Sequence, residues 1–286
     1  MVGYELPYNQ VPDRLKSIPS APKQIFHAGA DLSELLQRPV VAIVGSRKVT
    51  PYGQQVTIKL ARELAEQGVV IVSGLALGVD ALAHQAALQA GGLTIAVLPS
   101  PIEQIAPSSH TQLAQRIAEQ GGALISEYPA GMPALVQNFV ARNRLVAGLS
   151  DALLITEAAL KSGSLHTARF ALDQGKDVLA VPGNITNPIA AGVNNLIRAG
   201  ATPITCTEDV LSVLQMHFNV LAPLKVATGA NHYEQTVIDL LKTGLTDGEQ
   251  LQRGSRLDIA AFNQTLTMLE LSGKIRPLGA GNWALR

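Results

Sequence analysis

The chain has 286 residues, of which 47% are hydrophobic and 15% charged, so it can bury a substantial core and is not expected to be disordered. Lysine plus arginine balance aspartate plus glutamate at 22 each, which argues against nucleic-acid binding through an overall positive charge. The sequence has one cysteine, no apolar run of membrane-spanning length and no secretory leader, so we expect a cytoplasmic protein with neither an internal disulfide nor a membrane partner.

Prolines at positions 7, 12, 19 and 22 interrupt residues 1–38. We interpret this irregular N-terminal lead-in segment as an extended arm or a short helical lead-in rather than a separate domain. Short apolar runs then recur at 40–44, 69–72, 93–98, 123–125, 152–155 and 178–181. Stretches with helical spacing separate them, at 51–67, 79–90, 110–120, 164–174 and 192–199. Continuous apolar strands that alternate with amphipathic helices are typical of a parallel sheet covered on both faces. The sequence therefore predicts an α/β fold, a doubly wound, mainly parallel Rossmann-type sheet over residues 39–215.

The C-terminal part has a different pattern. Residues 216–231 show no clear period and are interpreted as a linker. Three helical segments follow and then a hairpin around Trp283, which predicts a small C-terminal winged-helix domain over residues 232–286. Its third helix would expose Asn263, Gln264 and Thr267 rather than basic side chains. This pattern favours a protein-contact module over a reader of duplex DNA, and both interpretations stay open.

Glycine turns follow four of the predicted strands, at the edge where open parallel sheets bind their ligands. Glycine allows a tight turn, while amides, hydroxyls and basic side chains suit phosphate oxygens. One such turn alone could be merely a short loop, but four of them (the fourth at 182–184) predict an extended anionic ligand. The candidate phosphate-binding residues are Gly45, Ser46, Arg47, Lys48, Gly74, Lys161, Ser162, Gly163, Ser164 and Thr167.

A further cluster precedes the fifth predicted strand. Arg142, Asn143 and Arg144 suit phosphate groups, and Phe139 is a candidate for stacking on a base. The alternative is a solvated helical turn held by salt bridges. The sequence contains neither a Gly-x-Gly-x-x-Gly fingerprint nor a Gly-x-x-x-x-Gly-Lys-Ser/Thr loop, so we expect no nucleotide cofactor, and no metal-ligand spacing is present.

Six blocks resemble the signature of the DNA processing protein A family (DprA, also called Smf), in the family's order and spacing. They are VAIVGSR at 41–47, SGLALGVDALAH at 73–84, SEYP at 126–129, RNRLVAGL at 142–149, EAALKSGSLHTA at 157–168 and VPG at 181–183. The resemblance implies a non-enzymatic homodimer, joined through the Rossmann domain. Such proteins bind and protect incoming single-stranded DNA in natural transformation and help to load the RecA recombinase.

The resemblance also implies roles for individual residues. Arg47, with the amides near Gly45 and Ser46, would hold phosphates, the loop at 161–167 would hold a neighbouring phosphate, and Arg142 and Arg144 would line the same groove. Leu77 stands where the family has a basic residue, and residues 99–109 lack the family's Gly-rich stretch.

An enzymatic alternative rests on Glu157, which follows the fifth predicted strand beside the loop at 161–167. It suits a nucleotide-processing enzyme of the lysine-decarboxylase-like, phosphoribohydrolase type. The Pro-Gly-Gly-x-Gly-Thr loop of such enzymes is missing from the sequence.

Overall fold

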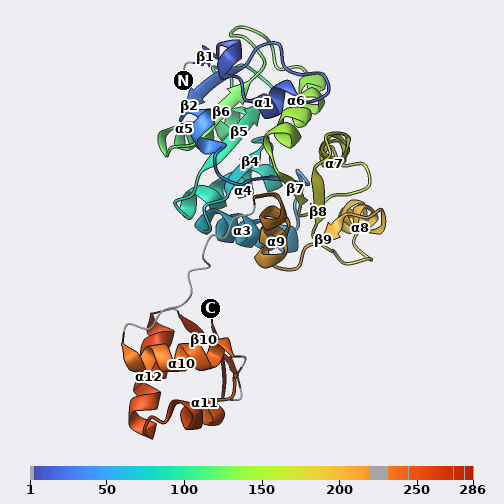
Figure 1. The fold of residues 1–286 in the computed structure, drawn as a ribbon. Helices are drawn as coiled ribbons and strands as arrows, with labels where there is room; N and C mark the ends of the chain where they lie inside the picture. Colours follow the sequence, from blue (N-terminus) through green and yellow to red (C-terminus); the bar gives the residue numbers. More distant parts are fainter. Residues whose placement is uncertain (1–2, 219–230, 244, 273, 280, 286) are drawn as a thin grey trace. The chain divides into compact units, whose positions relative to one another are not determined.

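The computed structural model describes residues 3–218, 231–243, 245–272, 274–279 and 281–285, and the chain forms two compact units, Met1–Asn219 and Val220–Arg286 (Figure 1). The strands of the first unit are β1 (Tyr4–Glu5), β2 (Phe26–Gly29), β3 (Val40–Val44), β4 (Val70–Ser73), β5 (Thr94–Leu98), β6 (Ala123–Ser126), β7 (Ala152–Ile155), β8 (Asp177–Ala180) and β9 (Thr202–Pro203). Its α-helices are α1 (Asp13–Lys16), α2 (Leu32–Leu35), α3 (Pro51–Glu66), α4 (Val79–Gln89), α5 (Thr111–Glu119), α6 (Val136–Leu149), α7 (Ser164–Asp173), α8 (Ala191–Arg198) and α9 (Thr207–Phe218).

The described strands of this unit form one sheet in the order β1-β2-β6-β5-β4-β3-β7-β8-β9. Along the stretch β6-β5-β4-β3-β7-β8-β9, each pair of adjacent strands is parallel. From β3 the chain adds β4, β5 and β6 in turn toward one edge of the sheet. Helix α6 then brings it back to the middle, where β7 pairs with β3, and β8 and β9 extend the sheet toward the opposite edge. The strand order therefore reverses between β3 and β7, which is the switch point where doubly wound sheets bind ligands.

Both faces of the sheet are buried, as the continuous apolar runs predict. Val40, Ala42 and Val44 of β3 pack in a cluster with α6 and α7, whereas Val41 and Ile43 pack on the opposite face with α3, α4 and α9. Successive side chains of a strand point to opposite faces, so a strand covered on both sides has no polar alternation. The doubly wound α/β prediction is confirmed.

Besides the short helices α1 and α2, the lead-in segment contributes two strands to the sheet, which neither interpretation of it anticipated. Strand β2 pairs antiparallel with β6 over its whole length, and β1 pairs with β2 (Figure 1). Leu15 and Ile25 are fully buried in the same cluster as α6. The sequence Phe26–Gly29 carries little strand signal of its own, because it contains a histidine and a glycine. Pairing with the edge of β6 decides its conformation.

The second unit contains α10 (His232–Lys242), α11 (Gly248–Ser255) and α12 (Ile259–Leu271), followed by the antiparallel hairpin of β10 (Ile275–Gly279) and β11 (Asn282–Leu285). Its core includes Leu251, Phe262 and Ile275, with Trp283 packed against them. This is the predicted winged helix, and α12 exposes the polar side chains expected. Of the predicted linker, 216–218 belong to α9, and 219–230 lie outside the described residues.

Candidate functional site

A pocket of about 500 Å³ lies at the switch point of the sheet. The turns after β3 and β7 contribute to it, as do the turn before α4, the exposed face of α6 and the start of α7. Twelve of the fourteen candidate residues line it, and they come from three segments. They are Gly45, Ser46, Arg47, Lys48, Phe139, Arg142, Asn143, Lys161, Ser162, Gly163, Ser164 and Thr167. We call this cavity the switch-point pocket.

Four cationic side chains and one carboxylate line the switch-point pocket. Arg47, Lys48 and Lys161 are exposed, and none of them has an ion-pair partner among the described residues. The Arg47 guanidinium lies over the Phe139 ring, 5.3 Å from its centroid, in cation–π geometry. A chain with zero net charge thus concentrates positive charge at one concave site, which is where an anionic ligand would gain most.

Arg142 has a different place from the other cations, because it is buried, with 3% of its surface exposed. Its Nη1 donates to the carbonyls of Gly74 and Val97, and its Nε donates to the Asn143 side chain at 3.2 Å. Burial lowers the pKa of Arg142 to about 10, opposed by the charge of Asp80, so the guanidinium remains protonated at neutral pH. Arg142 therefore forms the charged floor of the pocket and links the turn after β4 to strand β5.

Asp80 complements this buried charge. Its Oδ2 accepts hydrogen bonds from the amides of Gly74, at 3.1 Å, and Ala76, at 3.4 Å. Burial raises the pKa of the Asp80 carboxyl, and the charge of Arg142 opposes that rise. Sequence analysis did not single out Asp80. The available signal was an acidic residue in the first turn of α4, just after Gly78, whose φ is +78°.

The turn after β3 uses its backbone for packing as well as for the site. The Ser46 amide donates to the Glu157 carbonyl at 2.7 Å, so that amide is already satisfied and does not face a ligand. A Cβ at Gly45 would meet the Glu157 carbonyl oxygen and the Val79 side chain, each at 2.7 Å. Glycine is needed here because the turns after β3 and β7 approach closely, and the groups of this turn that remain available at the pocket are the Arg47 and Lys48 side chains.

The loop before α7 presents hydroxyls and one ammonium group. The Ser162 and Ser164 hydroxyls are hydrogen-bonded to each other at 2.7 Å, and the Ser164 amide lies 3.4 Å from the Ser162 oxygen. A Cβ at Gly163 would meet no atom within 4 Å, so the backbone is open to a ligand at that position. Lys161 projects from the same loop. These groups line the same pocket as Arg47 and Lys48.

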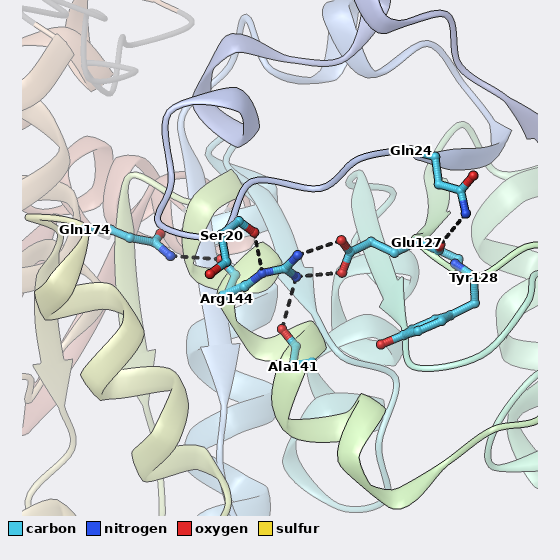
Figure 2. A network of polar contacts seen from close by, with 8 residues as sticks. Ser20, Gln24, Glu127, Tyr128, Ala141, Arg144 and Gln174 are labelled. Carbon is cyan, nitrogen blue, oxygen red and sulfur yellow. Dashed lines mark hydrogen bonds and ion pairs between the residues drawn. The ribbon is translucent and has the colours of Figure 1, made fainter.

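Two candidate residues do not line the switch-point pocket. Gly74 lies beneath it, where a Cβ would overlap the Arg142 guanidinium. Arg144 faces away, and both of its terminal nitrogens donate to the Glu127 carboxylate at 2.6 Å (Figure 2). Its Nε donates to the Ser20 carbonyl at 2.9 Å. The expected groove with Arg142 and Arg144 side by side is therefore not formed, since residues two apart on a helix differ by about 200° in direction.

The fourth glycine turn, at 182–184, lies outside the switch-point pocket. Gly183 and Asn184 line a separate cavity of about 400 Å³ together with Glu157. The buried Glu157 carboxylate accepts hydrogen bonds from the Thr50 amide at 2.8 Å and the Thr50 hydroxyl at 2.6 Å. Both of its oxygens thus fix the N-terminus of α3 against β7, which is a structural use of the carboxylate.

Some residues in the lining were not anticipated because they are apolar. Ala76, Val140, Ala159 and Ile189 contribute to the pocket wall, and nothing in their chemistry marks them in a sequence. Within the described part of the chain, no three His, Cys, Asp or Glu side chains are grouped as metal ligands would be. No described helix has the length and apolar character needed to cross a membrane.

Comparison with known proteins places this architecture in a family. The model of the DNA recombination-mediator protein A family matches residues 6–215, and that of the DprA winged helix domain matches residues 226–281. Protein Smf from Escherichia coli is 49% identical over 175 residues, covering 61% of this chain and 47% of that protein. DNA processing protein DprA from Bacillus subtilis is 40% identical over 205 residues, covering 72% of this chain and 68% of the relative. The chain therefore spans about half the length of the Escherichia coli protein.

Solved structures agree with this assignment. DNA processing protein A from Streptococcus pneumoniae superposes with a TM-score of 0.69 at 38% identity, covering 73% of this chain and 74% of that one. DNA processing protein A from Helicobacter pylori, solved to explain its single-stranded DNA binding mode, has a TM-score of 0.68 at 37% identity, covering 75% of this chain and 96% of that one. The chain belongs to the DNA recombination-mediator protein A family.

Proposed function

We propose that this protein binds single-stranded DNA in the switch-point pocket, with phosphates against Arg47, Lys48 and Lys161 and a base against Phe139. The observation that carries the proposal is that these three cations converge on one pocket from loops more than a hundred residues apart, without ionic partners among the described residues. Exposed cations without partners favour an anion. The binding mode described for the relative from Helicobacter pylori supports the same ligand.

A single strand suits the pocket better than a duplex. The Phe139 ring and the Arg47 guanidinium offer flat surfaces inside a concave site, and a base must leave its stack to reach them. A duplex keeps its bases stacked and paired, so it would contact only the rim charges. Shape and aromatic content therefore favour an unpaired strand.

The biological role is proposed from the family. The protein protects incoming single-stranded DNA in natural transformation and helps to load the RecA recombinase on it, acting in the cytoplasm as a homodimer joined through the first unit. This role is one of binding and handover rather than of catalysis. Recombinase assembly on DNA already covered by a single-strand-binding protein should become faster when this protein is added, and sedimentation should give twice the monomer mass. If the protein leaves the delay before recombinase assembly unchanged, the loading role is refuted.

The enzymatic alternative gains no support from Glu157. Its carboxylate is committed to Thr50 and faces the cavity lined by Gly183 rather than the switch-point pocket. Release of free base from nucleoside monophosphates, lost in Glu157→Gln, would revive that alternative.

The binding proposal is tested by comparing single-stranded with duplex oligonucleotides at fixed salt. Arg47→Ala and Lys161→Ala should each weaken single-strand binding by about 1–3 kcal/mol, the range for losing a charge-assisted contact. Arg62→Ala removes an exposed arginine on α3 outside the pocket and is the matched control. Equal affinities for all four proteins, or a preference for duplex, would refute the proposal.

A further inference from the structure

A second pocket, of about 540 Å³, lies on the other side of α6. Residues 20–24 of the lead-in segment and residues 127–132 after β6 form its walls, together with Arg144. Arg142 lines the switch-point pocket and Arg144 lines this one, so α6 separates the two. Because residues 127–129 directly follow β6, this second pocket also opens at the carboxyl edge of the sheet.

Arg144 and Glu127, which both line the second pocket, form a bidentate ion pair (Figure 2). The pair neutralises both charges, and the Ser20 carbonyl and the Ala141 carbonyl hold the guanidinium from two further sides. Arg144 is therefore occupied by protein groups and does not act as the anion-binding group there.

The groups that remain available are one ammonium group and two flat or apolar side chains. Lys23 is exposed and has no ion-pair partner among the described residues. The half-buried Tyr128 ring extends from the segment after Glu127 toward α6 (Figure 2), and Met132 is 45% exposed. Burial, with the Glu127 carboxylate beside it, raises the pKa of the Tyr128 phenol, which thus stays a hydrogen-bond donor at neutral pH.

Exposed apolar side chains lie in the chain between residues of the two pockets, and we call Met132, Leu135, Val136 and Val140 the apolar ridge. Met132 lines the second pocket and Val140 lines the switch-point pocket, and between them in the chain Leu135 and Val136 are 44% and 87% exposed. Large apolar side chains that stay exposed close together in the chain are typical of an interaction surface. The apolar ridge has a pocket with an exposed cation at each end. This arrangement fits a ligand that carries flat, largely apolar groups on a negatively charged backbone.

We propose that the second pocket is a nucleotide subsite for the same DNA strand, with a base against Tyr128 and Met132, a phosphate near Lys23, and the intervening nucleotides lying across Val136. The inference rests on the proposed function of the switch-point pocket. A helix with its side chains is about 10–12 Å across, a width that a few nucleotides span. A peptide partner would also cover the ridge, but it would not call for a cation in both pockets.

The experiment compares oligonucleotides of about four and about twelve nucleotides, the span of site sizes known for single-strand-binding folds. The short one fills the switch-point pocket alone, whereas the long one reaches both. Tyr128→Leu and Lys23→Ala should leave binding of the short oligonucleotide unchanged and weaken binding of the long one by roughly tenfold, as loss of one stacked base does. Tyr128→Phe keeps the ring and should bind the long oligonucleotide like the parent, and Arg62→Ala controls for charge.

A spectroscopic readout separates stacking from altered folding. An oligonucleotide with 2-aminopurine near one end should lose fluorescence on binding to the parent and to Tyr128→Phe, but not to Tyr128→Leu. Unchanged long-strand affinity and unchanged quenching in Tyr128→Leu would refute the second subsite while leaving the first intact. Failure of the parent to bind either oligonucleotide would refute the proposed function itself. Tighter binding by the Tyr128→Leu variant would overturn the assignment of the ring to a base.

Discussion

Replacing Arg142 by methionine removes the charge from the floor of the switch-point pocket while keeping apolar volume. The carbonyls of Gly74 and Val97 would lose their donor, and the buried Asp80 carboxylate would lose its neighbouring cation. Removing one partner of a buried charge pair lowers the free energy of unfolding by about 3–5 kcal/mol. The lost hydrogen bonds to the two carbonyls are included in that figure, because effects of groups in direct contact do not add. We therefore expect the Arg142→Met variant to be about 3–5 kcal/mol less stable at pH 7.

The loss should depend on pH with a defined sign. Burial already raises the pKa of Asp80, and Arg142 opposes that rise, so the variant has a higher Asp80 pKa than the parent. A carboxyl whose folded pKa lies above its unfolded value of about 3.9 holds its proton more tightly in the native state. Stability then falls as pH rises from the unfolded toward the folded pKa. The gap between parent and variant should accordingly widen from about pH 4 to pH 7.

Urea unfolding measures the stability difference between the parent and the Arg142→Met variant, and the second unit serves as an internal control. Far-UV circular dichroism follows mainly the first unit, whereas the single tryptophan, Trp283, lies in the second unit. The variant should shift the first transition and leave the tryptophan fluorescence transition in place. Adding Asp80→Asn should recover part of the loss, because no buried charge is then left alone. A loss below about 1 kcal/mol, or an equal loss at pH 4 and pH 7, would refute the assigned role of Arg142.

Two further outcomes concern buried polar groups. Burial lowers the pKa of His84 to about 3, against about 6.5 in the unfolded chain. Acid therefore protonates His84 in the unfolded state first, and the free energy of unfolding should fall as the pH drops from 6.5 toward 3. This one group contributes at most about 1.4 kcal/mol per pH unit to that fall. His84→Gln should flatten that slope in urea titrations, and parallel curves would contradict the expectation. Arg144→Met should destabilise the first unit by roughly 2–4 kcal/mol, because it leaves the largely buried Glu127 carboxylate without its ion-pair partner. Its affinity for a four-nucleotide strand should match that of Arg62→Ala, and a greater loss would place Arg144 in the switch-point pocket after all.

The central strands were predictable because burial on both faces leaves a direct trace in the sequence. The run Val40–Val44 is apolar at every position, and each of its side chains meets one of two cores. Strand β2 leaves no such trace, since it contains His27, which is buried with its ring nitrogens hydrogen-bonded to Tyr4 and Ala30. Its pairing with β6 is a tertiary effect that no local pattern contains.

The site was predictable to the extent that chain topology determines it. Turns after β3 and β7 must meet at the switch point, which brings Arg47 and Lys161 together whatever the details of packing. The different orientations of Arg142 and Arg144 follow from helical periodicity, once residues 136–149 are taken as a helix. Two features depend on packing that residue spacing alone does not reveal. They are the burial of Arg142 and the hydrogen bond that the Ser46 amide donates to the Glu157 carbonyl.

The salt dependence of single-strand affinity tests the central claim most directly. For single strands the logarithm of the binding constant falls with the logarithm of salt concentration by about 0.7 per neutralised phosphate. If Arg47 and Lys161 each hold a phosphate, Arg47→Ala and Lys161→Ala should each reduce the slope by about 0.7, while Arg62→Ala retains the parent slope. Lines parallel to that of the parent for both pocket variants would contradict the claim that these side chains hold the DNA backbone.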